Sequence, residues 1–329
     1  MTDRAIPWRA RLAAAVLDVS PDWGASAASK ALGAAARARL PRPLGRAFVS
    51  AYCKFFEVDL ADVDPRAIRE GWDSFNAFFT RRLVPGARPV DGRADVMVAP
   101  CDGLVRGAVP IERHTEVVAK GHAYTIGELI ADDELADSLV GGLATTIYLH
   151  PRDYHRVHVP CDGEVQRVIA VPGRLLPVTA AALERVPRLF AVNERLVHVL
   201  DTAAGPLVVV MIAAFGVGHM SCAYRHLDPH PTEIQRVECD PPVRLRKGDE
   251  LGVFHLGSTV VLLTRPGVRP LVPTEEPTVV RMGEPLLQRG DLASPGTSLP
   301  RSGCSTSPSS PAAARAAARR ATSSTTACA

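Results

Sequence analysis

The pattern of apolar and turn-forming residues changes at Val96, and this change constrains the fold more than any other feature. From there on, short apolar and often β-branched runs alternate with Gly, Pro and Asp, as in TTIYL, PLVVVMIA and STVVLL. Runs of this length between turn-forming residues are typical of β-strands. Upstream, the chain is rich in Ala, Leu and Arg, and we expect helices over 8–19, 24–40, 47–59 and 66–83. The sequence therefore predicts an α+β fold, with N-terminal helices on a largely antiparallel β core.

The N-terminal segment is basic. Residues 1–50 contain eight Lys and Arg against three Asp, whereas the whole chain carries a net charge of only +3. The remainder is therefore slightly acidic, and we expect no nucleic-acid partner. For residues 1–46 two interpretations stay open: amphipathic helices that lie on an anionic membrane surface, or ordinary helices that pack on their own domain.

The cysteines, the apolar runs and the C-terminal residues bear on the cellular compartment and on the extent of the folded domain. The seven cysteines are widely spaced without a C-x-x-C pair, which favours a reducing compartment over a disulfide framework or a zinc site. No apolar run reaches the roughly 18 residues that span a bilayer. After Asp291 the chain has no acidic residue and few large apolar ones, so we expect residues 291–329 to be disordered. The main globular domain is then expected over 47–290.

An internal repeat lies in the β-rich part. The tetrapeptide Pro-Cys-Asp-Gly begins at Pro100 and recurs at Pro160, each time as a turn that enters an apolar run. This favours a duplicated β unit, whose order of turns and strands is similar to that of the hybrid-barrel folds of carrier domains. A non-catalytic carrier or binding module is therefore an alternative, with Lys247 as its modifiable lysine. The Met residues that flank such a lysine are missing here.

Several polar segments suggest chemistry. The stretch YLHPRDYHRVHVP places His155 and His158 three residues apart, but it offers no obvious third ligand, so no metal site is predicted. Four further segments occur in order along the chain: FNAFFTRR at 75–82, PCDG at 100–103, FAVNER at 190–195 and LGST at 256–259. Together, over residues 47 to about 287, these five segments resemble phosphatidylserine decarboxylase proenzymes of the bacterial type. The stretch around Phe215 and His219 departs from the family's V-G-A-x-x-V-G-S-I pattern.

The resemblance implies self-processing between Gly257 and Ser258, giving a β chain of residues 1–257 and an α chain of residues 258–329. It implies that His158 is the base that activates the Ser258 hydroxyl and that Asp102 orients this base. The former Ser258 then carries a covalent pyruvoyl cofactor, which serves as electron sink while CO₂ leaves. His155 is the residue expected to handle the proton in decarboxylation, because imidazole exchanges protons near neutrality.

The resemblance also implies the reaction and its place. The expected activity is that of a lyase converting phosphatidylserine to phosphatidylethanolamine, at the cytoplasmic side of the cell membrane and without crossing it. The expected partners are phosphatidylserine in an anionic membrane, the α and β chains of one precursor and, as an option, a second copy in a homodimer. A pyruvoyl decarboxylase of a soluble amino acid is the alternative, which the basic N-terminus disfavours.

Overall fold

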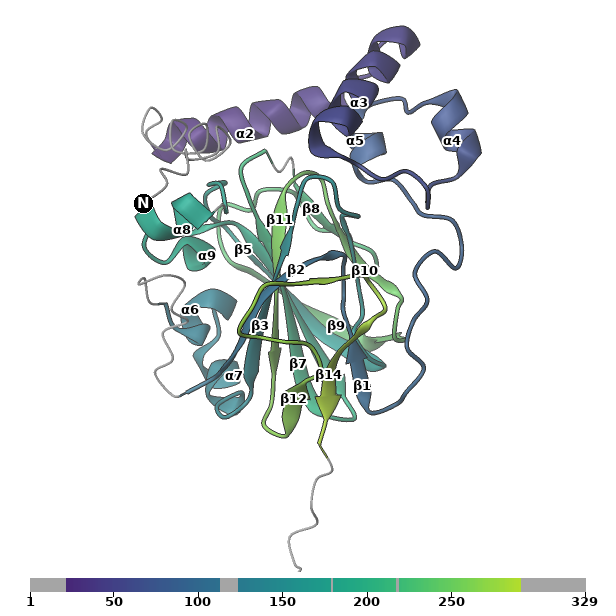
Figure 1. Cartoon of the computed structure of the whole chain (residues 1–329). Coiled ribbons are helices and arrows are strands. Elements are labelled where there is room, and N and C mark those ends of the chain that lie inside the picture. The colour runs from purple at the N-terminus through teal and green to yellow at the C-terminus, as the bar shows by residue number, and fades with distance from the viewer. Residues whose placement is uncertain (1–21, 113–123, 179, 217–218, 291–329) are drawn as a thin grey trace, which may run out of the picture. The chain divides into compact units, whose positions relative to one another are not determined.

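The fold is known from a computed structural model that describes residues 22–112, 124–178, 180–216 and 219–290. Its centre is an eight-stranded sheet in which every neighbouring pair of strands is antiparallel. Figure 1 shows its strands gathered below the N-terminal helices. The strand order is β13 (Thr278–Val280), β2 (Gly103–Pro110), β3 (Leu143–Leu149), β11 (Ser258–Thr264), β7 (Gly205–Ala213), β6 (Arg195–Thr202), β5 (Gly163–Val171) and β9 (Gln235–Leu245).

Two small antiparallel sheets complete the β core. One has the order β1 (Val96–Val98), β14 (Pro285–Arg289) and β12 (Val268–Pro270). The other has the order β4 (Arg156–His158), β10 (Glu250–Phe254) and β8 (Met220–Cys222). The expected α+β class with a mainly antiparallel β core is therefore confirmed.

The middle of the large sheet is covered on both faces. Every residue of β11 is buried, and so are the last seven residues of β7. Their side chains are mostly Val, Leu, Ile and Met, and a strand that alternates its side chains between two covered faces needs apolar residues at every position. A strand with this composition cannot lie at the edge of the molecule, so the residues at its ends are placed deep in the fold.

The helices differ partly from the expectation. The segments expected at 24–40 and 47–59 form α2 (Asp22–Arg37) and α3 (Arg42–Phe56), and α3 begins early because Pro43 is tolerated in a first helical turn. The single helix expected over 66–83 was wrong. The chain there forms α4 (Pro65–Glu70) and α5 (Phe75–Phe79), because Gly71 ends the first at φ 78° and Ser74 caps the second by accepting the N–H of Ala77.

Four short helices flank the sheet: α6 (Ile126–Ile130), α7 (Asp133–Ser138), α8 (Ala180–Arg185) and α9 (Leu189–Val192). The helix expected at 8–19 and the tail beyond Asp291 lie outside the described residues. None of the described helices is long and apolar enough to cross a bilayer.

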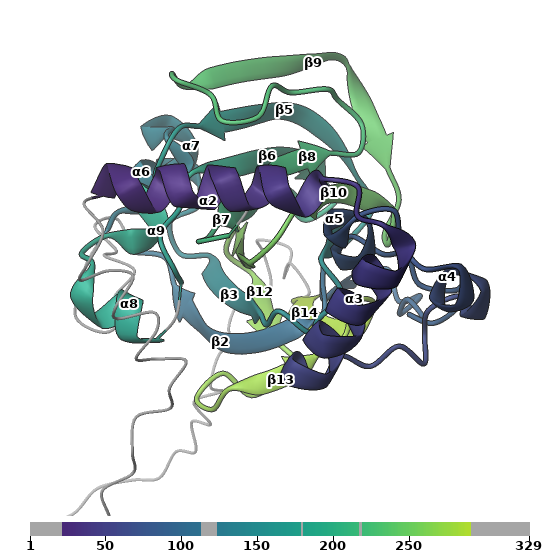
Figure 2. The same cartoon turned by 90° about the horizontal axis from the view of Figure 1, so that it is seen from above.

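Helix α2 packs on the β core. Its Ser26 and Ser29 hydroxyls accept the N–H groups of Leu175 at 3.3 Å and Gly216 at 2.8 Å. Near its C-terminal end, Ala36 joins a small buried cluster with Phe79 and Leu256. Seen from above, α2 runs across the strands of the core (Figure 2). Helix α2 thus contacts its own domain, and the expectation that residues 1–46 associate with a membrane stays a prediction.

Candidate active site

Ser258 is the first residue of β11 and lies at the centre of the large sheet. It is paired with Leu149 of β3 on one side and with Ala213 of β7 on the other, and only 1% of its surface is exposed. Its Oγ is buried and has no hydrogen-bond partner among the described residues. A buried hydroxyl without a partner is uncommon in folded proteins and calls for a functional explanation.

The two residues before Ser258 have unusual backbone angles. Leu256 has φ 97° and Gly257 has φ 38°. Positive φ is accessible to glycine but strained for leucine, because its Cβ collides with the backbone. The Leu256 side chain, 9% exposed, packs against Ala36 and Phe79, which holds the strained conformation in place. The peptide bond between Gly257 and Ser258 therefore directly follows a strained turn.

Asn193 fixes the strand beside Ser258. It belongs to the FAVNER segment and is fully buried. Its side-chain NH₂ donates to the carbonyls of Leu176 and Ala213, both at 2.9 Å, and its Oδ1 accepts the Leu176 N–H at 3.1 Å. Because Ala213 is the cross-strand partner of Ser258, this amide holds one wall of the site.

His155 is fully buried just before β4. Its ring lies 4.1 Å from the Phe79 ring, centroid to centroid, and its Nδ1 lies 2.9 Å from the carbonyl oxygen of Asp153. A carbonyl can only accept, so Nδ1 carries the hydrogen and Nε2 keeps a lone pair. That Nε2 is buried and unpartnered among the described residues. Burial lowers the pKa of His155 to about 3, so the imidazole is neutral at neutral pH.

His158 occupies a different environment at the end of β4. Its Nδ1 donates to the Gly248 carbonyl at 2.8 Å, and its Nε2 lies 3.1 Å from the Tyr154 hydroxyl, which therefore donates to it. Burial lowers the pKa of His158, while the Gly248 hydrogen bond and the nearby charges of Glu250 and Asp102 act in the opposite direction. His158 is thus a neutral acceptor held in one tautomer.

Asp102 is held by partners other than His158. Its carboxylate accepts two hydrogen bonds from Arg88 Nε, at 2.9 and 3.2 Å, and one from Arg88 Nη2 at 2.6 Å. A third donor, the backbone N–H of Met282, lies 2.9 Å away. In this conformation no hydrogen bond joins Asp102 to His158, or His158 to Ser258, among the described residues. Asp102 acts on the His158 imidazole through space, by its charge.

An open cavity of about 300 Å³ borders this region. Its walls are rich in charged side chains and come from the segment after α5, the turn before β2, the segment before β4 and strand β13; they include Arg81, Arg88, Asp102, Arg152, Asp153 and Tyr154. Asp153 is unusual among them: burial, aided by the charge of Asp102, raises the pKa of its carboxyl group to about 6, although its hydrogen bond from the His150 N–H opposes this.

Sequence reasoning missed three contributors to the site. Phe79 covers His155, Tyr154 holds His158, and Arg88 holds Asp102. Tyr154 and Arg88 lie in segments with conspicuous polar residues, but no spacing rule links Arg88 to Asp102 across a turn. Phe79 looked like ordinary core, which it also is, with 2% of its surface exposed.

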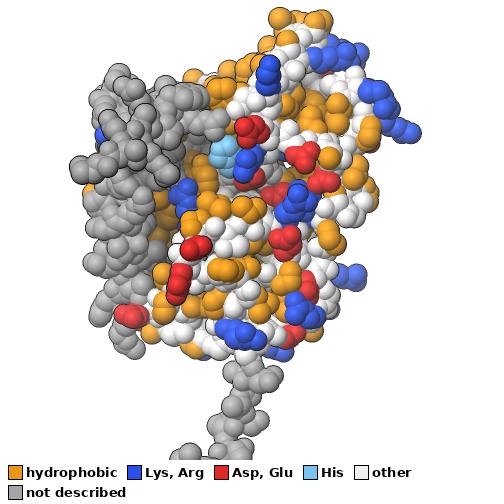
Figure 3. All heavy atoms as spheres, viewed as in Figure 1, with side chains coloured by type: hydrophobic (Ala, Val, Ile, Leu, Met, Phe, Trp, Pro, Cys, Tyr) orange, Lys and Arg blue, Asp and Glu red, His pale blue; other side chains and the backbone are white. Residues whose placement is uncertain are grey.

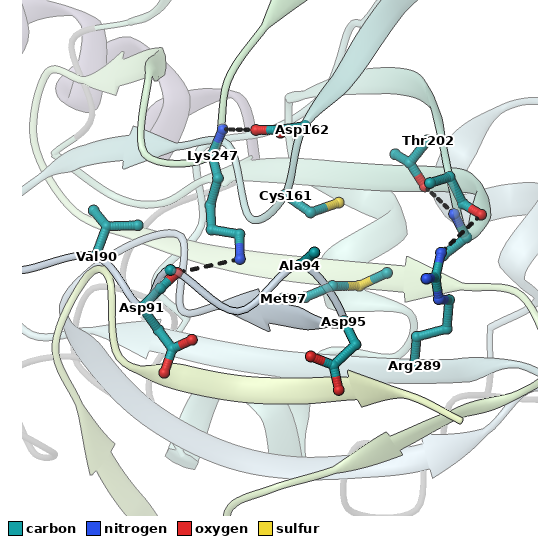
Figure 4. A pocket seen from close by; sticks show the side chains of 13 residues that line it. Val90, Asp91, Ala94, Asp95, Met97, Cys161, Asp162, Thr202, Lys247 and Arg289 are labelled. Atoms are coloured by element: carbon teal, nitrogen blue, oxygen red, sulfur yellow. Dashed lines mark hydrogen bonds between the residues drawn. The ribbon is translucent and has the colours of Figure 1, made fainter. Parts of the chain in front are cut away.

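Lys247 has a structural role. Its ammonium group donates to the carbonyls of Arg93 at 2.6 Å and Asp91 at 3.2 Å, and its backbone N–H donates to Asp162 at 2.7 Å (Figure 4). It borders an open cavity of about 390 Å³ that also involves Cys161 and Arg289. A carrier lysine has to reach out from a free hairpin tip, whereas this one is bound to the chain around residues 91–93. The carrier interpretation is therefore disfavoured.

The described residues contain no group of three or more His, Cys, Asp or Glu placed to hold a metal ion.

Comparison with known proteins identifies the family. Residues 75–288 match the family described as phosphatidylserine decarboxylase. The phosphatidylserine decarboxylase proenzyme of Azotobacter vinelandii is 42% identical over 244 residues, which cover 71% of this chain and 84% of that protein. The proenzymes of Bordetella petrii and Myxococcus xanthus are both 40% identical, over 78% and 79% of this chain and 91% and 92% of those proteins. The chain belongs to the phosphatidylserine decarboxylase family.

The raised pKa of Asp153 leads to a prediction about stability. A carboxyl group with a folded pKa of about 6 and an ordinary unfolded pKa of about 3.9 binds more protons in the folded state between these values. The free energy of unfolding must then fall as pH rises from about 4 to about 6, and level off above. Asp153→Asn removes this titration and keeps an oxygen for the His150 N–H.

We therefore expect Asp153→Asn to be more stable than its parent at pH 8, by about 1–3 kcal/mol, and the two proteins to converge near pH 4. Urea denaturation of both proteins across this range measures it, with Ser258→Ala in both chains so that each remains a single polypeptide. An equal difference between them at pH 4 and pH 8 would show that Asp153 titrates normally.

Proposed function

We propose that this chain is the proenzyme of a phosphatidylserine decarboxylase, which cleaves itself at Ser258 and then releases CO₂ from phosphatidylserine to give phosphatidylethanolamine. Family membership supports it, because the most similar relatives are proenzymes of this name. The observation that carries it is the Ser258 hydroxyl, buried and unpartnered at the start of a central strand, directly after a strained turn. A decarboxylase of a soluble amino acid is disfavoured by the names of those relatives.

Self-cleavage begins with attack of Ser258 Oγ on the carbonyl carbon of Gly257. The C–N bond breaks as the ester forms, and the amide nitrogen takes up the proton. Loss of the Ser258 Cα proton then expels the Gly257 carboxylate and leaves dehydroalanine, whose imine tautomer takes up water and releases ammonia. The chain thus ends at Gly257, and Ser258 becomes a pyruvoyl group, which supplies an electron sink for decarboxylation.

His158 is the base that we propose for the first step of self-cleavage. Its Nε2 is the acceptor nitrogen, and its Nδ1–H is anchored on Gly248, the arrangement in which an imidazole can accept a proton while staying oriented. The developing imidazolium would be stabilised by the nearby negative charge of Asp102. The Tyr154 hydroxyl now occupies Nε2 and has to give way to the Ser258 hydroxyl.

His155 is the residue that we propose for proton transfer during decarboxylation. Its free Nε2 lies in an apolar, fully buried setting against Phe79. Such an environment suits a group that transfers a proton to a carbon atom, because water cannot compete there. The burial that lowers its pKa to about 3 also makes the protonated form a strong acid once formed.

We also propose that the β core contains a duplicated unit. The two Pro-Cys-Asp-Gly turns meet with matched hydrogen bonds: the Val98 N–H donates to the Pro160 carbonyl at 2.9 Å, and the His158 N–H donates to the Pro100 carbonyl at 2.7 Å. Both donors and both acceptors are 60 residues apart. Each turn aspartate also accepts one further N–H, from Met282 to Asp102 and from Lys247 to Asp162, within the similar sequences RMGEPL and RKGDEL.

A membrane-facing role is proposed for α3. Of its fifteen residues only Val49 is buried. Leu44, Phe48 and Phe55 are 62%, 50% and 46% exposed, and at spacings of four and eleven residues they share one face of the helix. Figure 3 shows apolar and cationic side chains together on the helices at the upper right. An anionic bilayer matches this mixture, which supports a peripheral location on the cytoplasmic side.

The first functional prediction concerns self-cleavage. The purified protein should consist of two chains of 257 and 72 residues, about 27 and 8 kDa of the 35.1 kDa total, and the smaller should resist Edman degradation because it starts with a ketone. Ser258→Ala should leave one full-length chain on intact-mass analysis. The matched control is Thr264→Ala, which removes a buried hydroxyl from the other end of β11 and should still be cleaved. Cleavage of Ser258→Ala at the same bond would rule out the proposal.

The second functional prediction separates the two histidines. His155→Ala should be cut at least in part, yet its decarboxylation of phosphatidylserine should fall by a factor of about 10²–10⁴, the usual range for a lost proton-transfer group. His158→Ala should remain largely uncut. A cleavage gel beside a CO₂-release assay measures both, normalised to the amount of pyruvoyl chain. If His155→Ala stayed uncut while His158→Ala matured, the two roles would have to be exchanged.

The third functional prediction concerns membrane binding. Leu44→Asp combined with Phe55→Asp should strongly weaken sedimentation with anionic vesicles, because it places two charges on the exposed face of α3. Self-cleavage should not change, since neither side chain is buried. Ile234→Asp is the control, as a similarly exposed (43%) apolar residue that lies beside α6 and α7 and not on α3. Equal vesicle binding by the double variant and the control would contradict a membrane-facing α3.

A further inference from the structure

One arginine and two histidines converge beside the cleavage loop, the segment that leads from His255 to Ser258. Arg37 is the last residue of α2, and its Nη1 lies 3.3 Å from His219 Nδ1. The His219 ring stacks on the His255 ring, with centroids 3.8 Å apart and planes inclined by 10°. His255 precedes the Gly257–Ser258 bond by two residues. This cluster of Arg37, His219 and His255 therefore joins α2 to the loop that ends at the active serine.

The hydrogen bonds of the cluster fix its donors. Arg37 donates to His219 Nδ1, so His219 carries its hydrogen on Nε2. His255 Nδ1 lies 3.0 Å from Asn76 Oδ1, and its Nε2 lies 3.2 Å from Ser221 Oγ. The stacked ring of His255 is therefore held from both sides, whereas the His219 Nε2–H has no recorded partner among the described residues.

The charge of the cluster is positive and not neutralised. Burial lowers the pKa of His219 to about 4 and that of His255 to about 3, and the proximity of Arg37 adds to both shifts. Both imidazoles are then neutral, and Arg37 supplies the charge. No carboxylate in the described part of the chain lies within ion-pairing distance of Arg37. Two uncharged imidazoles do not balance a guanidinium, so the cluster favours an anion.

One member of the cluster, His219, borders a hollow at the surface. It lines an open cavity of about 630 Å³ together with Ser221, Tyr224, Arg225 and His226. This lining contains hydroxyl and cationic donors but no carboxylate. It has the composition expected for a site that accepts a phosphate oxygen.

We propose that Arg37 and His219, braced by His255, bind the phosphodiester of the phospholipid substrate. The inference rests on the proposed decarboxylase function. In that substrate the phosphorus is separated from the reacting carbon by one carbon and one oxygen, so the phosphate must lie near Ser258 when the serine amine reaches it. The Cα of His255 lies at most about 11 Å from that of Ser258, since only Leu256 and Gly257 lie between them.

The position of α2 supports the same assignment. Arg37 ends α2, and the chain continues within five residues into α3 with its exposed apolar face. A lipid whose acyl chains stay in the bilayer under α3 would present its phosphate at the junction of the two helices, between the membrane and the serine.

The test measures kinetics on the matured enzyme with two substrates. With glycerophosphoserine, which is soluble, Arg37→Ala and His219→Ala should each raise KM by about 10- to 100-fold, the effect of losing a hydrogen bond to a charged group, and change kcat little. With a serine ester that lacks phosphate, wild type and variants should have equal KM. Arg39→Ala is the matched control, because it removes the same charge two residues away and contacts no histidine. Arg37→Lys should recover part of the affinity.

A binding measurement on uncleaved precursor tests the site even in variants that cleave themselves poorly. In Ser258→Ala precursor, glycerophosphoserine should shift the His219 imidazole resonances in a titration, and Arg37→Ala should abolish the shift. If inorganic phosphate bound as tightly as glycerophosphoserine, the site would serve free phosphate and not the headgroup. An unchanged KM in active, fully matured Arg37→Ala and His219→Ala would also overturn the inference. Absence of decarboxylation by wild type with every substrate would instead refute the proposed function itself.

Discussion

The two-sided pairing of β11 is the constraint on which the rest of the structure depends. This strand lies between β3 and β7, and its first residue, Ser258, already takes part in both ladders. Cleavage before Ser258 would therefore leave the new chain end inside the sheet. The same C-terminal part also supplies β13 to β2 and β14 to β1. Backbone pairing and a shared apolar core join the two pieces across the cut, so we expect the fold to stay assembled after cleavage.

The same burial determines the state of the reacting groups. Ser258 Oγ and His155 Nε2 each lie away from water and have no partner in the described part of the chain, which costs about 1–3 kcal/mol per group. The large buried core around β7 and β11 can offset such a cost, as small domains rarely could. Burial also keeps His155 and His158 neutral, with their tautomers set by the carbonyls of Asp153 and Gly248. The fold thus holds two neutral imidazoles, each in a single tautomer.

Much of this could be predicted from the sequence, because it depends on local patterns. The β-rich part after Val96, the helices near 24–40 and 47–59 and the position of Ser258 at a strand start all follow from periodicity and motif. Contacts across the fold could not be predicted in this way. The pairing of Arg88 with Asp102 and the cover of Phe79 over His155 depend on how α5 and the following turn pack. The break between α4 and α5 was missed because Gly71 and Ser74 lie within an otherwise helical composition.

Helices α2 and α3 connect an exposed apolar surface to the segment that precedes Ser258. Ala36 packs on Leu256, and Arg37 reaches His219, so the C-terminal turn of α2 contacts the cleavage loop at two points. A few residues later α3 exposes its apolar face. Because Leu256 keeps its strained φ only while its side chain is held, any displacement of α2 would relax the peptide before Ser258. The exposed apolar face of α3 and the geometry of the scissile bond are therefore linked through the same short segment, residues 36–44.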